Sequence, residues 1–404
     1  MQFLLLDVID CHELNVCKEF YQYPQRSDGC YHNPDQYLEV TSMIQRYGFN
    51  VESYEVITED GYILKVFRIP NPSRPPVFLQ HGITISCICF TNSGNHSIAF
   101  LLHQAGYDVW LGNYRGNRYS SKHVKLKTND IAFWDFSFHE NGKYDMRVQM
   151  DLVKGITGKK LYYIGYSMGT TAAYIYNILY PEEAEDRVKL FINLAPILYL
   201  RNLKSIVYPI APFWSTIEPY VMKLTNGVIF RRTKAAIEIL KRNCLQNVQR
   251  MLKCQLAYQN IFGYDIDQFD PEIIPITLAQ NLEAASIKTI SHYYQVINSD
   301  EFRHYDYGIR ENIELYGTVR PPIYNLSKLT VPVYLIYGQN DYVSTVENVE
   351  RLYNELPKRL TPYGKYKIPY EKFNHMDFTI AKDRKALLYD HLINFLNQIS
   401  QLEE

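Results

Sequence analysis

The sequence predicts an α/β fold, in which a mostly parallel sheet is flanked by helices and interrupted by an inserted helical segment. Short apolar runs of strand length alternate with helix-like segments in the first half of the chain and again near its end. This alternation is typical of a parallel sheet that is covered on both faces. It stops between about 197 and 310, where apolar residues recur at helical spacing instead.

Length and composition support this class. A chain of 404 residues allows one large core with an insertion, or two domains. Hydrophobic residues make up 47% and charged residues 21%, which excludes disordered and fibrous proteins. The net charge of −1 gives no overall attraction to nucleic acid, so no nucleic-acid partner is expected. We expect four segments: a poorly defined N-terminal segment (1–32), the first part of the core (33–196), a helical cap insertion (197–310) and the second part of the core (311–404).

The first part of the core begins with a short helix and a hairpin. The runs on either side of Asp60-Gly61 alternate apolar and polar residues over 54–69, which is a strong hairpin signal. The expected strands of this part are 77–80, 107–111, 161–164 and 188–194, and the expected helices are 37–47, 98–105, 145–154 and a helix that ends at 180.

The second part continues the alternation. Its expected elements are a strand over 331–337, a helix over 346–356, a strand over 366–368 and a closing helix over 382–399. Within the insertion, one helical face collects apolar side chains, namely Ile237, Leu240, Cys244, Val248, Met251 and Leu252.

The segment Gly165-Tyr166-Ser167-Met168-Gly169 matches G-x-S-x-G between a predicted strand and a predicted helix. This context is typical of a nucleophile elbow, which exposes a serine hydroxyl at the carboxyl edge of a sheet. The uncharged run 161–180 has roughly the length of a membrane span. A central strand and a buried helix explain it better, so we expect no transmembrane helix. The alternative to a nucleophile elbow at 165–169 is a plain tight connection between strand and helix.

A serine nucleophile needs a base and an acid that orients it, in the chain order Ser, Asp or Glu, His. Two histidines lie late enough: His375, in an expected loop, and His391, inside the expected last helix. We take His375 as the base. Asp341 ends the segment Gly338-Gln-Asn-Asp341, which directly follows the strand 331–337, at the edge where parallel sheets present catalytic groups. Asp377 is the rival acid, but only two residues from the base it is poorly placed to reach Nδ1.

Two backbone N–H groups are expected to form an oxyanion hole. Met168 opens the helix after Ser167, and a helix N-terminus favours anions. Ile83, in His81-Gly82-Ile83, follows the strand 77–80, from which the second donor comes in this kind of fold. The alternative is that His81 packs in the core and Gly82 only turns the chain.

Seven cysteines show no CxxC pair and no zinc-like spacing, so we expect no metal and no other cofactor. The sequons at Asn95 and Asn325 would accept glycans in the secretory pathway. At the N-terminus the apolar run is cut short by Asp7 and Asp10, which indicates a poor or missing signal peptide.

Together these residues resemble the acid lipase family, which includes gastric lipase and lysosomal acid lipase. The resemblance covers nearly the whole chain from about Asn33. The matching segments are YEVITEDGYIL (54–64), FLQHGI (78–83), AGYDVWLGNYRGNRYSSKH (105–123), FWDFSFHE (133–140), GYSMG (165–169), NLAP (193–196), PPIYNLS (321–327) and FNHMDF (373–378).

The resemblance implies an α/β-hydrolase core, a helical cap over an apolar pocket, and hydrolysis of neutral lipid esters, either triacylglycerol or steryl ester, at a lipid–water interface. It implies a secreted or lysosomal protein. The family's nucleophile, acid and base fall on Ser167, Asp341 and His375, and its oxyanion donors on Ile83 and Met168. A short-chain carboxylesterase is the alternative enzyme, and an inactive lipid-binding protein is the alternative outside enzymes.

Three further positions bear on the resemblance. Cys244 and Cys254 match the family's disulfide pair, and two buried thiols are the alternative. Met168 stands where gastric-type members have Gln, and Phe262 stands where gastric lipase has a free cysteine. The family's loop with His and Gly ahead of the last cap helix is replaced by AQNLEAAS (279–286).

Overall fold

The central sheet of the molecule has the strand order β1-β2-β4-β3-β6-β7-β10-β11, with β5 paired to β2. The computed structural model describes residues 33–245, 248–270 and 272–401. The N-terminal segment 1–32, where a poor or missing signal peptide is expected, therefore lies outside the described residues. The strands are β1 (Glu52–Ile57), β2 (Tyr62–Ile69), β3 (Pro76–Gln80), β4 (Asp108–Leu111), β5 (Lys122–His123), β6 (Leu161–Tyr166), β7 (Val188–Leu194), β10 (Val333–Tyr337) and β11 (Lys365–Lys367).

From β4 to β11 all neighbouring strands are parallel, whereas β1, β2 and β5 pair antiparallel. The predicted hairpin is confirmed, with Glu52 opposite Arg68 and Ile57 opposite Ile63. Gly61 takes a φ of 96° in its turn, a conformation that favours glycine. Every residue of β6 is buried, as expected for a central strand that helices cover on both faces.

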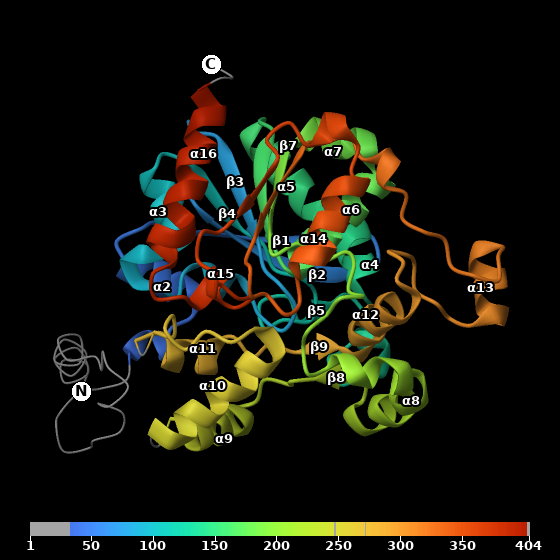
Figure 1. Ribbon diagram of the computed structural model, residues 1–404. Helices are drawn as coiled ribbons and strands as arrows, with labels where there is room; N and C mark the ends of the chain where they lie inside the picture. Colours follow the sequence, from blue (N-terminus) through green and yellow to red (C-terminus); the bar gives the residue numbers. More distant parts are fainter. Residues whose placement is uncertain (1–32, 246–247, 271, 402–404) are drawn as a thin grey trace.

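Helices cover the two faces of the sheet in separate layers (Figure 1). On one face α2 (Val40–Arg46), α3 (Ile98–Gln104) and α16 (Asp390–Gln401) pack against side chains such as Leu79 and Ile164. On the other face α5 (Arg147–Thr157), α6 (Met168–Leu179) and α14 (Val346–Glu355) pack against side chains such as Phe78 and Tyr163. The α/β class predicted from the alternation is therefore confirmed.

The chain between β7 and β10 is mostly helical. Its helices α8 to α11 lie below the sheet in the view of Figure 1, whereas α13 projects away to one side. A disulfide bond between Cys244 and Cys254 joins two of its helices, α9 and α10. The segment also contains a small antiparallel sheet of β8 and β9, which the sequence did not predict. Its elements are α8 (Trp214–Thr225), β8 (Val228–Ile229), α9 (Lys234–Cys244), α10 (Val248–Phe262), α11 (Ile274–Gln280), β9 (Ala285–Ser286), α12 (Ile287–Ser299) and α13 (Ile309–Tyr316).

Some expected elements differ in detail. The apolar face predicted around 237–252 is divided between two helices, and Leu252 is wrong as a member of it, because its side chain is 38% exposed. The expected helix 37–47 begins only at Val40, after a 3₁₀ turn, Pro34–Tyr37. A π-helical turn, Lys385–Tyr389, precedes the last helix. Within the described ranges, every helix is too short or too polar to span a bilayer.

Candidate active site

Ser167 occupies a sharp turn between β6 and α6. Its backbone has φ 54° and ψ −118°, a region that residues other than glycine rarely adopt. The turn is held because the Ser167 N–H donates to the carbonyl of Leu194 at 3.0 Å, while the Ser167 carbonyl accepts from the Thr170 N–H at 2.8 Å. The strained conformation places the serine at the carboxyl end of β6, directly before the N-terminus of α6, as the G-x-S-x-G pattern predicts.

The glycines around Ser167 are required by close backbone contacts. A Cβ atom on Gly165 would lie 2.9 Å from backbone atoms of Gly169, and one on Gly169 would lie 2.7 Å from the carbonyl oxygen of Gln80. A Cβ on Gly82 would lie 3.0 Å from the Cβ of Ser167. Strand β3, the serine turn and α6 therefore approach each other too closely for a side chain at Gly165 or Gly169, and a side chain at Gly82 would require Ser167 to shift.

His375 and Asp341 lie next to the serine. The distance from Ser167 Oγ to His375 Nε2 is 2.9 Å, and Nδ1 of the same ring is 2.8 Å from Asp341 Oδ2. The other carboxylate oxygen of Asp341 accepts hydrogen bonds from the backbone N–H groups of Val343 and Ser344 at 2.8 and 2.7 Å. All three side chains are buried. This chain of hydrogen bonds can move a proton from the serine hydroxyl to the imidazole while the carboxylate fixes the ring.

Two aromatic residues, Phe262 and Tyr166, contact His375. The ring of Phe262, at the end of α10, stacks on the imidazole at a centroid distance of 5.7 Å, and the His375 N–H donates to the Phe262 carbonyl at 3.2 Å. The Tyr166 hydroxyl donates to the carbonyl of His375 at 2.7 Å. The segment between β7 and β10 thus contacts the histidine directly. The sequence singled out Phe262 only as a departure from the family pattern, because no local signal shows which rings meet across the fold.

The two rival residues occupy other environments. Asp377 Oδ2 accepts from the backbone N–H of Asn374 at 2.7 Å, and burial holds the pKa of this carboxyl well above its usual value, reinforced by the nearby Asp265. His391 stacks on Tyr366 at a centroid distance of 3.6 Å in the last helix. Neither Asp377 nor His391 is placed in the hydrogen-bond chain of the serine.

His81 controls the orientation of the peptide between Gly82 and Ile83. Its Nε2 accepts from the backbone N–H of Tyr114 at 3.2 Å, and since an N–H can only donate, the ring proton resides on Nδ1. Nδ1–H then donates to the carbonyl of Gly82 at 2.7 Å. In a trans peptide the carbonyl and the next N–H point in opposite directions, so the Ile83 N–H is turned away from His81. Burial lowers the pKa of His81 to about 4, which keeps the ring neutral near pH 7.

A cavity beside Ser167 has about 320 Å³ of empty space, part of it open to solvent. Both expected oxyanion donors, Ile83 and Met168, line it, and so do residues of β9 and the start of α12, among them Ala285 and Thr289. The segment between β7 and β10 therefore forms one wall of the space next to Ser167. In the part of the chain that the structure describes, no group of three or more His, Cys, Asp and Glu side chains could hold a metal ion.

Comparison with known families and proteins places this geometry in context. Residues 40–94 match the model of a partial alpha/beta-hydrolase lipase region, and residues 75–225 match the alpha/beta hydrolase fold. The chain is 35% identical to Lipase 1 of Drosophila melanogaster over 91% of this chain and 81% of that protein. It is 33% identical to human gastric triacylglycerol lipase over 91% of this chain and 92% of that protein.

One more relative and one crystal structure are also similar to this chain. Human lipase member K is 32% identical and aligns over 94% of this chain and 96% of its own length. A crystal structure from Sulfolobus solfataricus superposes with a TM-score of 0.52 at 15% identity, covering 86% of this chain and 94% of that one, which shows a shared fold.

Proposed function

Because the chain belongs to the family of α/β-hydrolase lipases that includes gastric triacylglycerol lipase, we propose that it hydrolyses the carboxylic ester bonds of neutral lipids, with Ser167 as nucleophile, His375 as general base and Asp341 as the acid that orients it. The observation that carries the proposal is the unbroken hydrogen-bond chain from Ser167 Oγ through His375 to Asp341, at 2.9 and 2.8 Å.

The reaction proceeds in two steps. Ser167 Oγ attacks the ester carbonyl while His375 Nε2 takes the hydroxyl proton, and the negative charge on the carbonyl oxygen is held by the N–H groups of Ile83 and Met168. His375 then gives the proton to the leaving alcohol, which breaks the ester bond and leaves an acyl-enzyme. Water, deprotonated by the same imidazole, releases the fatty acid and restores the serine. Asp341 stabilises the imidazolium at each stage.

Residues 197–310 form the cap over the nucleophile in this proposal. Ser167 is only 6% exposed, and cap residues contact His375 through Phe262 and line the cavity beside Met168. An ester must therefore pass the cap to reach the serine, and its acyl chain can be bound by apolar side chains there. Each methylene that such a chain buries contributes about 0.8 kcal/mol of binding free energy.

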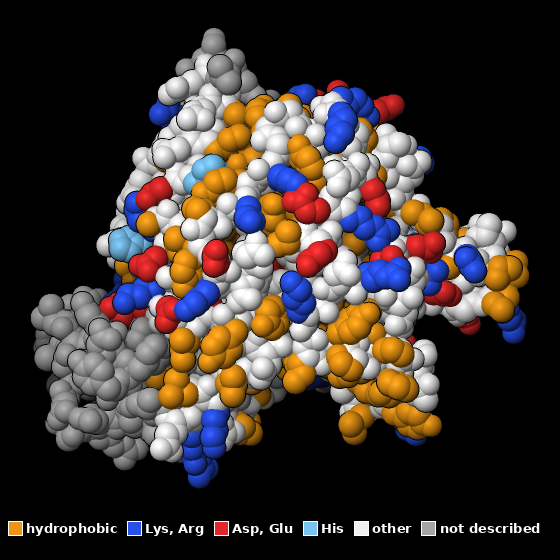
Figure 2. All heavy atoms as spheres, in the orientation of Figure 1, with side chains coloured by type: hydrophobic (Ala, Val, Ile, Leu, Met, Phe, Trp, Pro, Cys, Tyr) orange, Lys and Arg blue, Asp and Glu red, His pale blue; other side chains and the backbone are white. Residues whose placement is uncertain are grey.

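The outer surface of the cap suits a lipid–water interface. Large apolar side chains are exposed around α8, and a second group is exposed on α9, α10 and the loop that follows α10; Figure 2 shows hydrophobic side chains gathered in these regions. The exposure of Leu224 reaches 88%. Contact with lipid would remove this area from water. The first group is Ile206, Phe213, Ile217, Tyr220 and Leu224, and the second is Ile239, Leu252, Leu256, Tyr264 and Ile266.

We also place the protein in the secretory pathway. The bond between Cys244 and Cys254 suits an oxidising compartment. The sequon residues Asn95 and Asn325 are both exposed, so glycans could be attached without disturbing the core. Treatment of the protein, expressed in insect or mammalian cells, with a peptide N-glycosidase should lower its mass. An unchanged mass together with free thiols at both cysteines would refute this placement.

The substrate is tested by kcat/KM for a series of p-nitrophenyl or glyceryl esters with two to eighteen acyl carbons, dispersed in detergent. We expect kcat/KM to rise with chain length, since the longer chain buries more apolar area under the cap. A kcat/KM that falls steadily from the two-carbon ester would favour a short-chain carboxylesterase. Binding of the esters with no turnover by intact protein would favour an inactive lipid-binding protein.

A further inference from the structure

A second apolar cavity lies between α10, α11 and the loop that carries His375, and it takes no part in the mechanism. It has about 420 Å³ of empty space, part of it open to solvent. Most of its lining is apolar, and Met376, which directly follows His375, forms part of it. The other lining residues include Met251, Tyr258, Phe269, Ile273 and Leu278.

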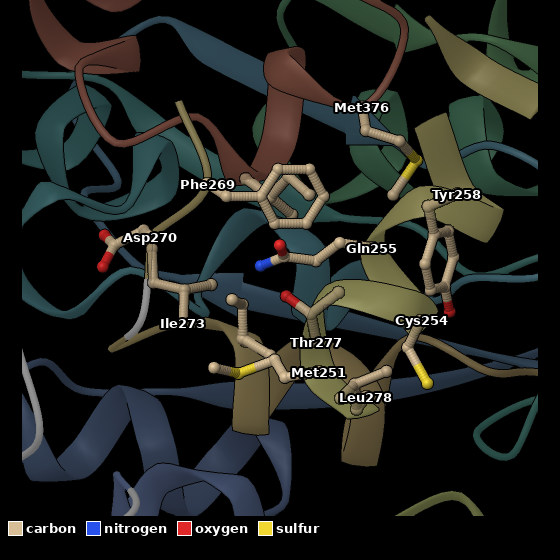
Figure 3. Close-up of a pocket in the computed structure, with 12 residues that line it drawn as sticks. Met251, Cys254, Gln255, Tyr258, Phe269, Asp270, Ile273, Thr277, Leu278 and Met376 are labelled. Carbon is tan, nitrogen blue, oxygen red and sulfur yellow. The ribbon is translucent and has the colours of Figure 1, made fainter. Parts of the chain in front are cut away.

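Two buried polar side chains interrupt this apolar lining. Gln255 is 3% exposed and Thr277 is 7% exposed. The amide nitrogen and amide oxygen of Gln255 and the hydroxyl of Thr277 have no hydrogen-bond partner among the described residues. Figure 3 shows the Gln255 amide reaching into the middle of the cavity, with the Thr277 hydroxyl beside it. An unpaired buried amide is unfavourable, and because this one faces the cavity, a ligand bound there can satisfy it.

The chemistry of the lining residues limits which class of ligand the cavity can bind. Among the described residues that line the cavity, Asp270 alone carries a formal charge, and Tyr258 is the other group that can titrate, since Cys254 is in the disulfide. Because no cation lines the cavity among the described residues, an anionic head group bound to Gln255 would be buried without a counter-charge, which is unfavourable. The head group must therefore be uncharged, and it must offer both a donor and an acceptor to the two ends of the Gln255 amide.

From these contacts we infer that the cavity binds a long-chain fatty acid in its protonated form, with the alkyl chain against Met251, Leu278 and their neighbours. The carboxylic acid carbonyl accepts from Gln255 Nε2, and its O–H donates to Gln255 Oε1. An alcohol has only one oxygen with which to contact both Nε2 and Oε1 of Gln255, and an ester has no hydrogen-bond donor. This site goes beyond the proposed function, because it would bind the fatty acid without reacting with it.

The test uses full-length protein whose catalytic serine has been blocked with diethyl p-nitrophenyl phosphate, so that the space beside Ser167 is filled. Binding of tetradecanoic acid, tetradecanol and methyl tetradecanoate is measured by calorimetry at pH 5. We expect one acid molecule per chain, bound more tightly than the alcohol or the ester, and an affinity that rises about fourfold per added methylene until the cavity is filled. A ¹³C label in the carboxyl group should report the protonated form in the complex.

Variants separate this site from non-specific binding. Gln255→Leu should weaken acid binding about tenfold or more, while leaving the fold intact or more stable, because it removes two unpaired polar atoms. The control is Gln259→Leu, one turn along α10: Gln259 is also 3% exposed with an unpartnered amide nitrogen, but it does not line the cavity. The affinity of Gln259→Leu for the acid should stay within twofold of the parent value. Leu278→Trp is a second test that does not depend on the folding of Gln255→Leu. Its larger side chain fills the cavity and should abolish binding.

The outcomes are decisive. Equal affinity of the parent and of Gln255→Leu, or equal affinity for acid and ester, overturns the inference. Loss of all binding on blocking the serine would also overturn it, since the chain would then occupy only the space beside Ser167. If the phosphate reagent fails to modify Ser167, the proposed catalytic function fails instead, and binding by the unmodified protein still tests the cavity through the two glutamine variants.

Discussion

Replacement of His81 by Phe tests whether the oxyanion hole depends on a hydrogen bond behind it. Phe fills a similar volume but removes the bond from Nδ1–H to the Gly82 carbonyl and the acceptor for the Tyr114 N–H. The Ile83 N–H is still present but its peptide is no longer fixed. Complete removal of one oxyanion donor lowers kcat by about 10²–10³. We therefore expect His81→Phe to lower kcat about 10–100-fold with little change in KM.

The assay is steady-state hydrolysis of a soluble short-chain ester, followed together with thermal unfolding. Because the buried Tyr114 N–H loses its partner, the free energy of unfolding should fall by about 1–3 kcal/mol. His391→Phe is the control, since this half-buried histidine of α16 stacks on Tyr366 of β11 and contacts the Tyr334 hydroxyl at 2.9 Å, away from Ser167. Its kcat should remain within twofold of the parent. A kcat for His81→Phe within twofold of the parent would refute the reasoning.

Three more changes have expected outcomes. Cys244→Ser with Cys254→Ser should destabilise the cap by about 3 kcal/mol in the loop-entropy model, and an unchanged melting temperature would contradict this. Burial raises the pKa of Asp377, so the folded state holds its proton more tightly than the unfolded state and stability is lost as the pH rises above about 4. Asp377→Asn should therefore raise the melting temperature more at pH 7.5 than at pH 4.5, and an equal or opposite difference would show the sign to be wrong. Gly169→Ala places a Cβ 2.7 Å from the carbonyl oxygen of Gln80, so it should lower kcat at least about tenfold; full activity would mean that the strand and helix can separate.

Local sequence signals were sufficient for the core of the fold. Alternating apolar and polar residues around Asp60-Gly61 predicted the hairpin, and the uncharged run 161–180 with its G-x-S-x-G turn predicted a buried strand and helix. The structure has these elements. The chain order Ser, Asp, His likewise limited the late candidates to His375 and His391, and the structure brings His375 to Ser167.

The cap could be predicted only as a helical region. Its apolar residues serve both the interior and the exposed surface, so periodicity assigned Leu252 to the buried face although it points outward. Contacts between segments far apart in the chain are not indicated by any local sequence pattern. The stacking of Phe262 on His375 joins residues more than a hundred positions apart, and the unpaired amide of Gln255 became visible only once the surrounding side chains were placed.

The central claim is that Ser167 forms the covalent intermediate, and active-site labelling tests it most directly. The intact protein is treated with a fluorophosphonate, digested, and analysed by mass spectrometry, in parallel with Ser167→Ala and His375→Ala. We predict stoichiometric labelling of Ser167 with parallel loss of ester hydrolysis, no labelling of Ser167→Ala, and labelling of His375→Ala slowed at least about a hundredfold. Modification of a different serine, or ester turnover by Ser167→Ala at more than a few per cent of the parent rate, would contradict the account.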